Sequence, residues 1–249
     1  MWIPRWLGEI YSKLFVKFED ELFTFNQAKS LLSIKENKLS VAFSKLHSKR
    51  LITIFKRSVP RIYRLMDPQF LLFAASGVIK NYEMIPQERY LRLIFRCFQE
   101  IFKARDIELT SFAVYGSVSR GTAKENSDVD ILLISESFKG SLGSRLDRLC
   151  ELEEALQDEL DWLSEHGIYT HLSYYPLRKE EAELIPLLFL DMTEEAVILY
   201  DKDGFLESLL LELKSKLLKQ GVKRIFIDDQ RWYWDLKPDY EVGELVEVA

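Results

Sequence analysis

The sequence has few of the features that mark secreted, cysteine-stapled or membrane-spanning proteins. Its 249 residues include two cysteines, Cys97 and Cys150, and each stands alone on the apolar stripe of a predicted helix. Neither a disulfide framework nor a zinc site is therefore expected, and the predicted location is the reducing cytoplasm. The sequence also shows no fixed-period repeat and no low-complexity tract.

Long apolar runs are missing as well. The longest strongly apolar stretch, near residues 70–79, is interrupted by Ser76 and Gly77 and is too short to span a bilayer. The first residues, MWIPRWLGEIYSK, lack the long apolar segment and small-residue cleavage site of a signal peptide. With 47% hydrophobic and 30% charged residues, the composition predicts a soluble globular protein of about two modest domains, without a membrane partner.

The charges are unevenly distributed along the chain. Residues 1–66 contain 13 Lys/Arg against 5 Asp/Glu, a balance of +8, and the remainder carries 21 basic and 35 acidic residues, a balance of −14. Such asymmetry predicts two functionally different parts. The basic part is the candidate for contact with nucleic acid.

The basic segment has the pattern of a small DNA-binding module. After a first helix, LFTFNQAKSLLSI and LSVAFSKLHSKR have apolar residues at helical spacing, and LITIFKRSVPRIYRL follows as two strand-like runs around a basic turn. This order resembles a winged helix-turn-helix domain, here over residues 1–68. The resemblance implies DNA contacts from the 40–50 helix and the 56–61 wing, through Lys45, Lys49, Lys56, Arg57 and Arg61. A solvated basic face, or a module for dimerisation or docking, is the alternative.

The rest of the chain alternates helical and strand-like segments. We expect a linking helix and loop at 69–86, a central domain at 87–205, and a C-terminal helix with an aromatic tail at 206–249. In the central domain a long amphipathic helix precedes the strands SFAVY and VDILLI, a helix at 143–167 and a third strand, IYTHLSYYPL. This order predicts an α/β (α+β) domain with a small mixed sheet flanked by helices.

Polar residues gather between the first two of these strands, in the stretch VYGSVSRGTAKENSDVDILLI at 114–134. Gly116 and Ser117 follow a strand and precede a turn or helix start, where unpaired backbone N–H groups suit a phosphate. Arg120 can add a charge-assisted contact, and Ser127 can orient the second turn. These four residues form the predicted nucleotide-binding group.

Two carboxylates open the second strand. Asp128 and Asp130 lie on one face, because alternate side chains of a strand point the same way, while Val129 and Ile131 point into the core. Two hard oxygen ligands on one face form half of a magnesium site, which substrate phosphates and water complete. The alternative is a capped turn in which the aspartates satisfy backbone donors.

This spacing resembles that of the polymerase-beta-type nucleotidyltransferase superfamily, especially its minimal archaeal and prokaryotic members. The resemblance implies a nucleoside triphosphate substrate, with ATP expected, and one or two Mg²⁺ ions on the aspartates. It also implies that an acceptor hydroxyl, on a protein or an RNA, attacks the α-phosphorus and displaces pyrophosphate. The likeness extends over residues 85–205 at domain level and rests on Gly116-Ser117, Arg120-Gly121, Ser127 and Asp128-Val129-Asp130.

Active members of that superfamily usually add a third carboxylate from a nearby strand, and the corresponding strand here, IYTHLSYYPL, has none. Asp191 interrupts an apolar stretch and is the favoured substitute as a catalytic residue, against the alternative of a helix cap or turn residue. Glu180 and Glu181 are further options, whereas Glu195 is expected to be solvated. His171 lies on that strand, but imidazole is a poor magnesium ligand.

Several functions remain open at this point. The leading hypothesis is a magnesium-dependent nucleotidyltransferase that is associated with DNA and acts on an unknown hydroxyl acceptor. Since the third carboxylate is not evident, a catalytically weak nucleotide-binding regulator and an antitoxin-like partner protein are the alternatives. The aromatic tail around 232–234 either straps the core or covers the cleft, and a homodimer is compatible with each function.

Overall fold

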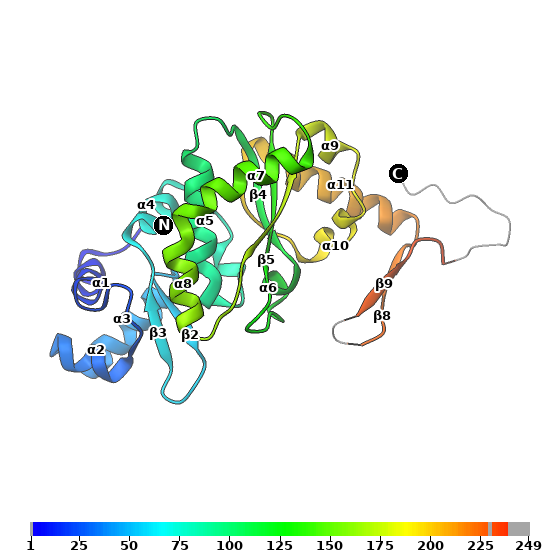
Figure 1. Cartoon of the computed structure of the whole chain (residues 1–249). Coiled ribbons are helices and arrows are strands. Elements are labelled where there is room, and N and C mark those ends of the chain that lie inside the picture. Colours follow the sequence, from blue (N-terminus) through cyan, green and yellow to red (C-terminus); the bar gives the residue numbers. More distant parts are fainter. Residues whose placement is uncertain (1, 229–230, 239–249) are drawn as a thin grey trace.

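The N-terminal part consists of three helices packed beside a three-stranded sheet (Figure 1). The sheet has the strand order β1-β3-β2 and is antiparallel throughout. The helices and the hairpin expected from the sequence are present in the expected order, and the winged-helix resemblance itself stays a prediction. The computed structural model describes residues 2–228 and 231–238, and these first elements are α1 (Arg5–Phe18), β1 (Phe23–Thr24), α2 (Phe25–Leu32), α3 (Glu36–Ser48), β2 (Ile52–Lys56) and β3 (Ile62–Leu65).

A linking segment leads from this part to the central sheet. The backbone N–H of Lys80 donates to Leu199 at 2.8 Å, and the side-chain amide of Asn81 donates to the carbonyl of Ile198 at 2.9 Å. Both bonds reach an edge strand of the sheet, so the linker is part of the packed structure. Its elements are α4 (Pro68–Ser76) and two 3-10 turns, η1 (Tyr82–Met84) and η2 (Glu88–Tyr90).

The central sheet has four strands in the order β6-β5-β4-β7. Strand β5 is parallel to β6 and antiparallel to β4, and β4 is antiparallel to β7, so the sheet is mixed as predicted. Its strands are β4 (Leu109–Tyr115), β5 (Val129–Ser135), β6 (Leu172–Leu177) and β7 (Val197–Asp201). The flanking elements are α5 (Leu91–Lys103), α6 (Gly116–Arg120), α7 (Leu142–Glu153), η3 (Glu154–Leu156), α8 (Gln157–Glu165), α9 (Lys179–Glu183), α10 (Leu188–Glu195), η4 (Lys202–Gly204) and α11 (Phe205–Lys219).

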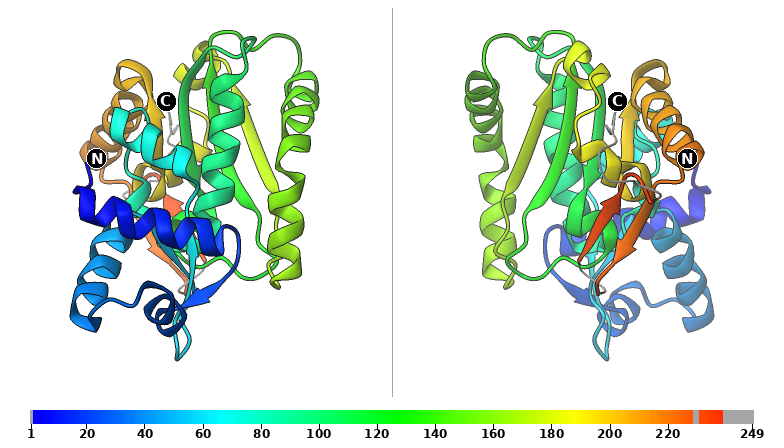
Figure 2. Two further views of the ribbon diagram at one scale, coloured as in Figure 1. Left: turned by 90° about the vertical axis from the view of Figure 1, so that its left-hand side faces the viewer. Right: turned by 90° about the vertical axis from the view of Figure 1, so that its right-hand side faces the viewer.

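Helices cover both faces of this sheet (Figure 2). Alternate side chains of β4 and β5 enter two different apolar clusters, as the period of a strand requires. Phe112, Val114, Ile131 and Leu133 pack in the cluster that contains α5 and α7, and Ala113, Leu132 and Ile134 pack in the cluster of α10 and α11. The predicted arrangement of a small sheet flanked by helices is therefore confirmed.

The first of these clusters is continuous from Leu7 of α1 to Leu199 of β7. This apolar packing is continuous across residues 68 and 86. The domain boundaries expected at these two positions therefore remain predictions. The helix expected at 143–167 is in fact α7 and α8 joined by the 3-10 turn η3, which buries Leu156, and the two helices run in different directions (Figure 1).

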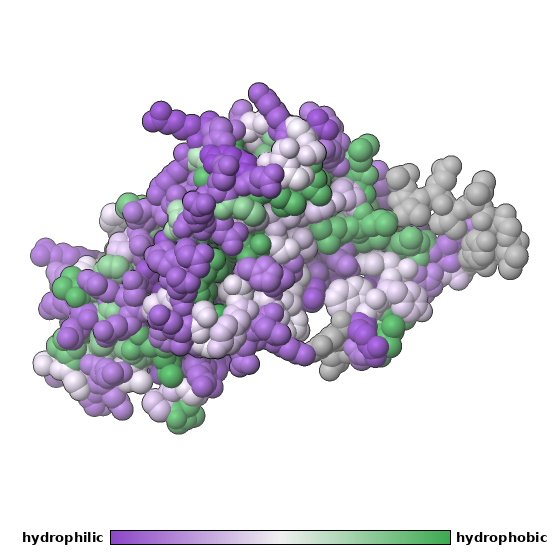
Figure 3. Space-filling view, in the orientation of Figure 1, coloured by the Kyte–Doolittle hydropathy of each residue, from purple (hydrophilic) through white to green (hydrophobic). Residues whose placement is uncertain are grey.

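The C-terminal helix α11 leads into a small antiparallel hairpin, β8 (Lys223–Phe226) and β9 (Trp232–Asp235). The end of the aromatic tail, from residue 239 on, lies outside the described residues. Hydrophilic residues predominate on the face drawn in Figure 3, where apolar residues form scattered patches. Within the described ranges, no helix has the length and apolar character needed to cross a membrane.

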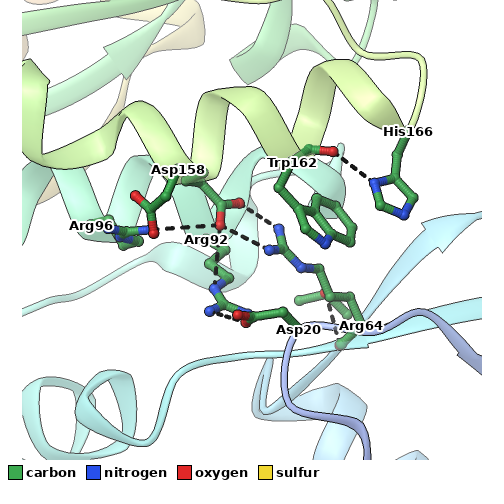
Figure 4. Close-up of polar contacts among 9 residues, drawn as sticks. Asp20, Arg64, Arg92, Arg96, Asp158, Trp162 and His166 are labelled. Carbon is green, nitrogen blue, oxygen red and sulfur yellow. Dashed lines mark hydrogen bonds and ion pairs between the residues drawn. The ribbon is translucent and has the colours of Figure 1, made fainter.

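A buried group of charges joins the N-terminal sheet to α8 (Figure 4). Arg64 of β3 makes a two-pronged contact with Glu159 of α8, with one of the bonds at 2.8 Å, and each of the two residues is 2% exposed. Arg92 of α5 lies 3.5 Å from the same carboxylate and also pairs with Asp20. Burial lowers the pKa of Arg64, and the bond and charge of Glu159 oppose that change.

Aromatic rings close this group on one side. The guanidinium carbon of Arg64 lies 3.4 Å from the centre of a Trp162 ring, and His166 stacks on Trp162 at 3.8 Å (Figure 4). A planar guanidinium suits such stacking better than an ammonium group does. The N-terminal sheet is thus held to α8 by paired charges that are shielded from water.

Replacing Glu159 with alanine is expected to lower the free energy of unfolding by about 3–5 kcal/mol, because Arg64 and Arg92 stay buried without their counter-charge. Asp158→Ala is the matched control, since the Asp158 side chain is 72% exposed and pairs with Arg96 at the surface. Asp158→Ala should lower the free energy of unfolding by no more than about 1 kcal/mol. Urea unfolding followed by circular dichroism measures both values, and equal losses would contradict a structural role for the buried group.

Candidate active site

The predicted site is built where β4 ends and β5 begins. Gly116 starts α6 directly after β4, and Tyr115, the last residue of β4, is the register partner of Asp130 on β5. A Cβ added to Gly116 would lie 2.1 Å from Oδ2 of Asp130, and the φ of this glycine is +73°. Glycine is needed here for both reasons, because the helix start lies directly against the carboxylate.

The two aspartates lie as the strand alternation predicts. Asp128 and Asp130 are both half-buried, whereas Val129 between them is fully buried in the core. Oδ1 of Asp128 lies 3.1 Å from Nε2 of His171, which precedes β6. Ser173 is the register partner of Asp130 on β6, and its hydroxyl lowers the pKa of the Asp130 carboxyl. His171 was expected on the third strand and lies directly before it, because β6 begins at Leu172.

The environment of Asp130 favours a cation. Burial raises the pKa of Asp130 above its ordinary value, and the charge of Asp128 raises it further, while the Ser173 hydroxyl and the charge of Arg120 oppose the rise. Burial and the nearby Asp130 charge also raise the pKa of Tyr115. A divalent cation between the two carboxylates would remove their repulsion, so these residues fit a magnesium ion.

In the part of the chain that the structure describes, no third carboxylate joins this pair. Among the described residues, no three His, Cys, Asp or Glu side chains are grouped so that they could hold a metal ion. Of the other acids considered from sequence, Glu181 is engaged by Arg145, with one bond at 2.8 Å, and that pairing lowers the pKa of Glu181 to about 2.

Arg120, at the end of α6, points to the C-terminal part of the chain. Its Nη1 donates to Glu195 at 2.7 Å, and its guanidinium lies 4.8 Å from the centre of a Trp232 ring. Arg224 of β8 donates to the same Glu195 at 3.2 Å. The expectation that Glu195 is solvated is wrong, because its side chain is 7% exposed and lies between these two arginines.

Asp191 lies one turn earlier on α10 and receives the same hairpin. The indole N–H groups of Trp232 and Trp234 both donate to its Oδ1, at 2.7 and 2.9 Å. Arg224 stacks over the Trp232 ring at 4.0 Å. The hairpin therefore packs on α10 through alternating charges and indole rings. It lies next to Arg120, which was predicted to contact phosphate.

The remaining predicted residues are distributed over the α6 turn and the N-terminal part. Ser117 is the second residue of α6, and the Ser127 hydroxyl accepts from the backbone N–H of Lys124 at 2.9 Å, which fixes the turn before Asp128. The candidate DNA contacts lie on α3 and at the tip of the β2–β3 hairpin, at a different place from the carboxylates. Lys49 is half-buried and the others are exposed: Lys45, Lys56, Arg57 and Arg61.

Gly116→Ala is expected to destabilise the fold more than Gly77→Ala does. Both glycines have a φ near +74°, so both substitutions carry about 1–2 kcal/mol of backbone strain. A new Cβ at residue 77 has nothing within 4 Å, whereas at residue 116 it meets Asp130. The clash should add roughly 1–3 kcal/mol, measured by urea unfolding, and equal losses would show that the close contact does not matter.

Comparisons with known proteins identify the family of the central domain. A family model described as a nucleotidyltransferase domain matches residues 91–188, which include α5, the α6 turn and β5. The chain is 31% identical over 124 residues to MJ1305 of Methanocaldococcus jannaschii, whose name provisionally assigns it to the protein adenylyltransferases. That match covers 50% of this chain and 79% of MJ1305.

Two solved structures are also similar to part of the chain. One is a toxin-antitoxin complex with AMP-PNP, at 18% identity and a TM-score of 0.34, covering 51% of this chain and 87% of the other. The second is the toxin-antitoxin MntA-HpeT with the mutation Y104A, at 17% identity and a TM-score of 0.33, covering 49% and 84%. The assignment rests on the two sequence matches: the chain belongs to the nucleotidyltransferase family of transferases.

Proposed function

We propose that this protein uses ATP and Mg²⁺ to transfer adenosine monophosphate to a hydroxyl group, in the cytoplasm. The observation that carries the proposal is the half-buried pair Asp128 and Asp130, of which Asp130 lies directly against the start of α6 at Gly116. A carboxylate pair that is partly removed from water is stabilised by a divalent cation. A helix start beside it offers backbone N–H groups to phosphate oxygens.

Each residue of the site has a distinct part in this proposal. Asp128 and Asp130 would hold the cation, and Ser173 lies next to Asp130 as its register partner on β6. The backbone N–H groups at Gly116 and Ser117 bind the phosphates and orient the α-phosphorus for attack. When bound, magnesium neutralises the charge that develops on the attacking and leaving oxygens.

The acceptor we favour is a protein hydroxyl, with RNA as the alternative. The support is the name of MJ1305, most of whose length this chain matches at 31% identity. Association with DNA through the N-terminal part belongs to the same proposal. Its support is the set of exposed basic residues on α3 and on the β2–β3 hairpin, together with the order of helices and strands there.

Asp128→Asn and Asp130→Asn are each expected to lower transfer at least about 100-fold, because each removes charge from the cation site. Purified protein is incubated with α-labelled ATP, Mg²⁺ and cell extract, and labelled protein and RNA are quantified. Asp161→Asn is the control, since Asp161 is an exposed carboxylate on α8 that accepts from Gln157. Labelling that survives in Asp128→Asn would overturn the metal assignment.

A different result would favour the regulatory alternative. If the wild-type protein binds ATP in an Asp128-dependent manner but labels no acceptor, the site is a nucleotide sensor with weak chemistry. Calorimetric titration of ATP and Mg²⁺ into the wild type and Asp128→Asn separates this outcome from a failure to bind.

Asp191 remains in the proposal as donor of a third oxygen. Both indole bonds go to its Oδ1, so Oδ2 lies outside that pair of bonds, and α10 would have to approach the aspartate pair for Oδ2 to reach the cation. Asp191→Asn preserves an oxygen for the indoles but removes the charge. We expect it to lower the same labelling by at least about 10-fold. If Asp191→Asn labels acceptors as strongly as the wild type does, the role of Asp191 is instead to hold the hairpin.

A further inference from the structure

A polar cleft lies between the N-terminal hairpin and the turn that follows α6. Its volume is about 370 Å³, and the described residues that line it are 54–57 of β2 and its turn, 86–89 of the linker, and Gly121. We propose that this cleft is a second phosphate-binding site, which holds a backbone phosphate of a nucleic acid bound at the β2–β3 hairpin. The inference deepens the DNA association proposed above and rests on it.

The uncompensated charge of the cleft is positive. Lys56 and Arg57 line it from the hairpin, and Arg89 lines it from the linker. The acid in this lining, Glu88, is neutralised from within the protein: Arg50 lies 2.8 Å from its carboxylate and the N–H of Ile54 donates to it at 2.7 Å. Burial alone would raise the pKa of Glu88, but bonds from His47 and Ile54 and the Arg50 charge hold it below its ordinary value.

The Arg89 side chain is held by the protein, and some of its N–H donors are not used within the protein. Its Nη2 donates to the carbonyl of Ala123 at 3.2 Å and to the Tyr90 hydroxyl at 3.4 Å, and its guanidinium lies over the Tyr90 ring. Its Nε is buried without a hydrogen-bond partner. A guanidinium has five N–H donors in a rigid fork that matches phosphate oxygens, so an anion in the cleft would satisfy donors that the protein leaves over.

The lining favours phosphate over a base. Phe55 is the aromatic residue of this lining, and its ring is already packed edge-on against Trp162 at 5.4 Å and His166 at 5.9 Å. The described lining therefore offers one aromatic ring, already in contact with two others, against three basic side chains. The basic side chains also continue out of the cleft along the hairpin to exposed Arg61, as a strand of linked phosphates requires and a single free nucleotide does not.

The wall of the cleft is tied to the candidate active site. The side-chain amide of Gln87 donates to the carbonyl of Ala123 at 2.8 Å and accepts from its N–H at 3.0 Å. Gly121, with φ +80°, packs against Pro86, where an added Cβ would lie 3.0 Å away. Because α6 has five residues, its two ends are separated by about 7 Å. A nucleic acid held in the cleft would therefore run close to the C-terminal end of α6, the helix whose first residue belongs to the proposed transfer site.

The test measures binding of a fluorescein-labelled 30-base-pair duplex, and of the matching single strand, by fluorescence anisotropy at several NaCl concentrations. Arg89→Gln and Lys56→Gln are each expected to weaken binding several-fold and to reduce the salt slope of log K by about one. Arg89→Lys should recover part of that slope, because it keeps the charge. Arg105→Gln is the matched control, since Arg105 is an exposed arginine in the turn after α5.

Unlabelled ATP binding is measured on the same proteins by calorimetry. The inference is supported if Arg89→Gln and Lys56→Gln keep the ATP affinity of the wild type and show a reduced salt slope of log K for the oligonucleotide. If Arg89→Gln weakens ATP binding instead, the cleft belongs to the donor nucleotide and the inference is wrong. If the wild type binds DNA and both variants keep the full slope, the inference fails while the DNA association stands. Absence of any nucleic-acid binding by the wild type would refute both.

Discussion

The active-site region depends on one close contact, between the backbone of Gly116 and the carboxylate of Asp130. The pairing of β4 with β5 brings Tyr115 opposite Asp130, so the next residue of the chain must turn over that carboxylate. A side chain at this point would occupy the space of Oδ2. The start of α6 and the Asp130 carboxylate can lie in contact because residue 116 has no Cβ. The positions of Arg120, Ser127 and Asp128 follow from that turn.

Two groups of alternating charges secure distant segments around this turn. Arg120, Glu195 and Arg224 connect α6, α10 and the C-terminal hairpin, while Arg64 and Glu159 connect the N-terminal hairpin with α8. In both groups a buried acid lies between arginines, and indole rings cover the guanidinium groups. Such groups contribute orientation more than net stability, since desolvation offsets much of the attraction.

The sequence was sufficient for features that local spacing controls. Alternation along a strand placed Asp128 and Asp130 on one face, and a Gly-Ser pair after a strand located the α6 turn. The partners that come from distant segments could not be predicted in this way. Ser173 depends on the parallel register of β5 and β6, and the burial of Glu195 depends on a hairpin about 30 residues further along, whose packing leaves no periodic signal. The 3-10 turn that divides 143–167 was missed because both halves carry the same helical period.

The contact between Arg64 and Glu159 also bears on how the protein is made. These residues are 95 positions apart in the sequence, and Glu159 is the one nearer the C-terminus. A growing polypeptide therefore completes its N-terminal hairpin well before the ribosome has produced the carboxylate that balances Arg64. Until α8 emerges, that arginine must remain hydrated and the hairpin cannot take its final place. The N-terminal part of this chain thus acquires its native support late in translation, when much of the central sheet has already been synthesised.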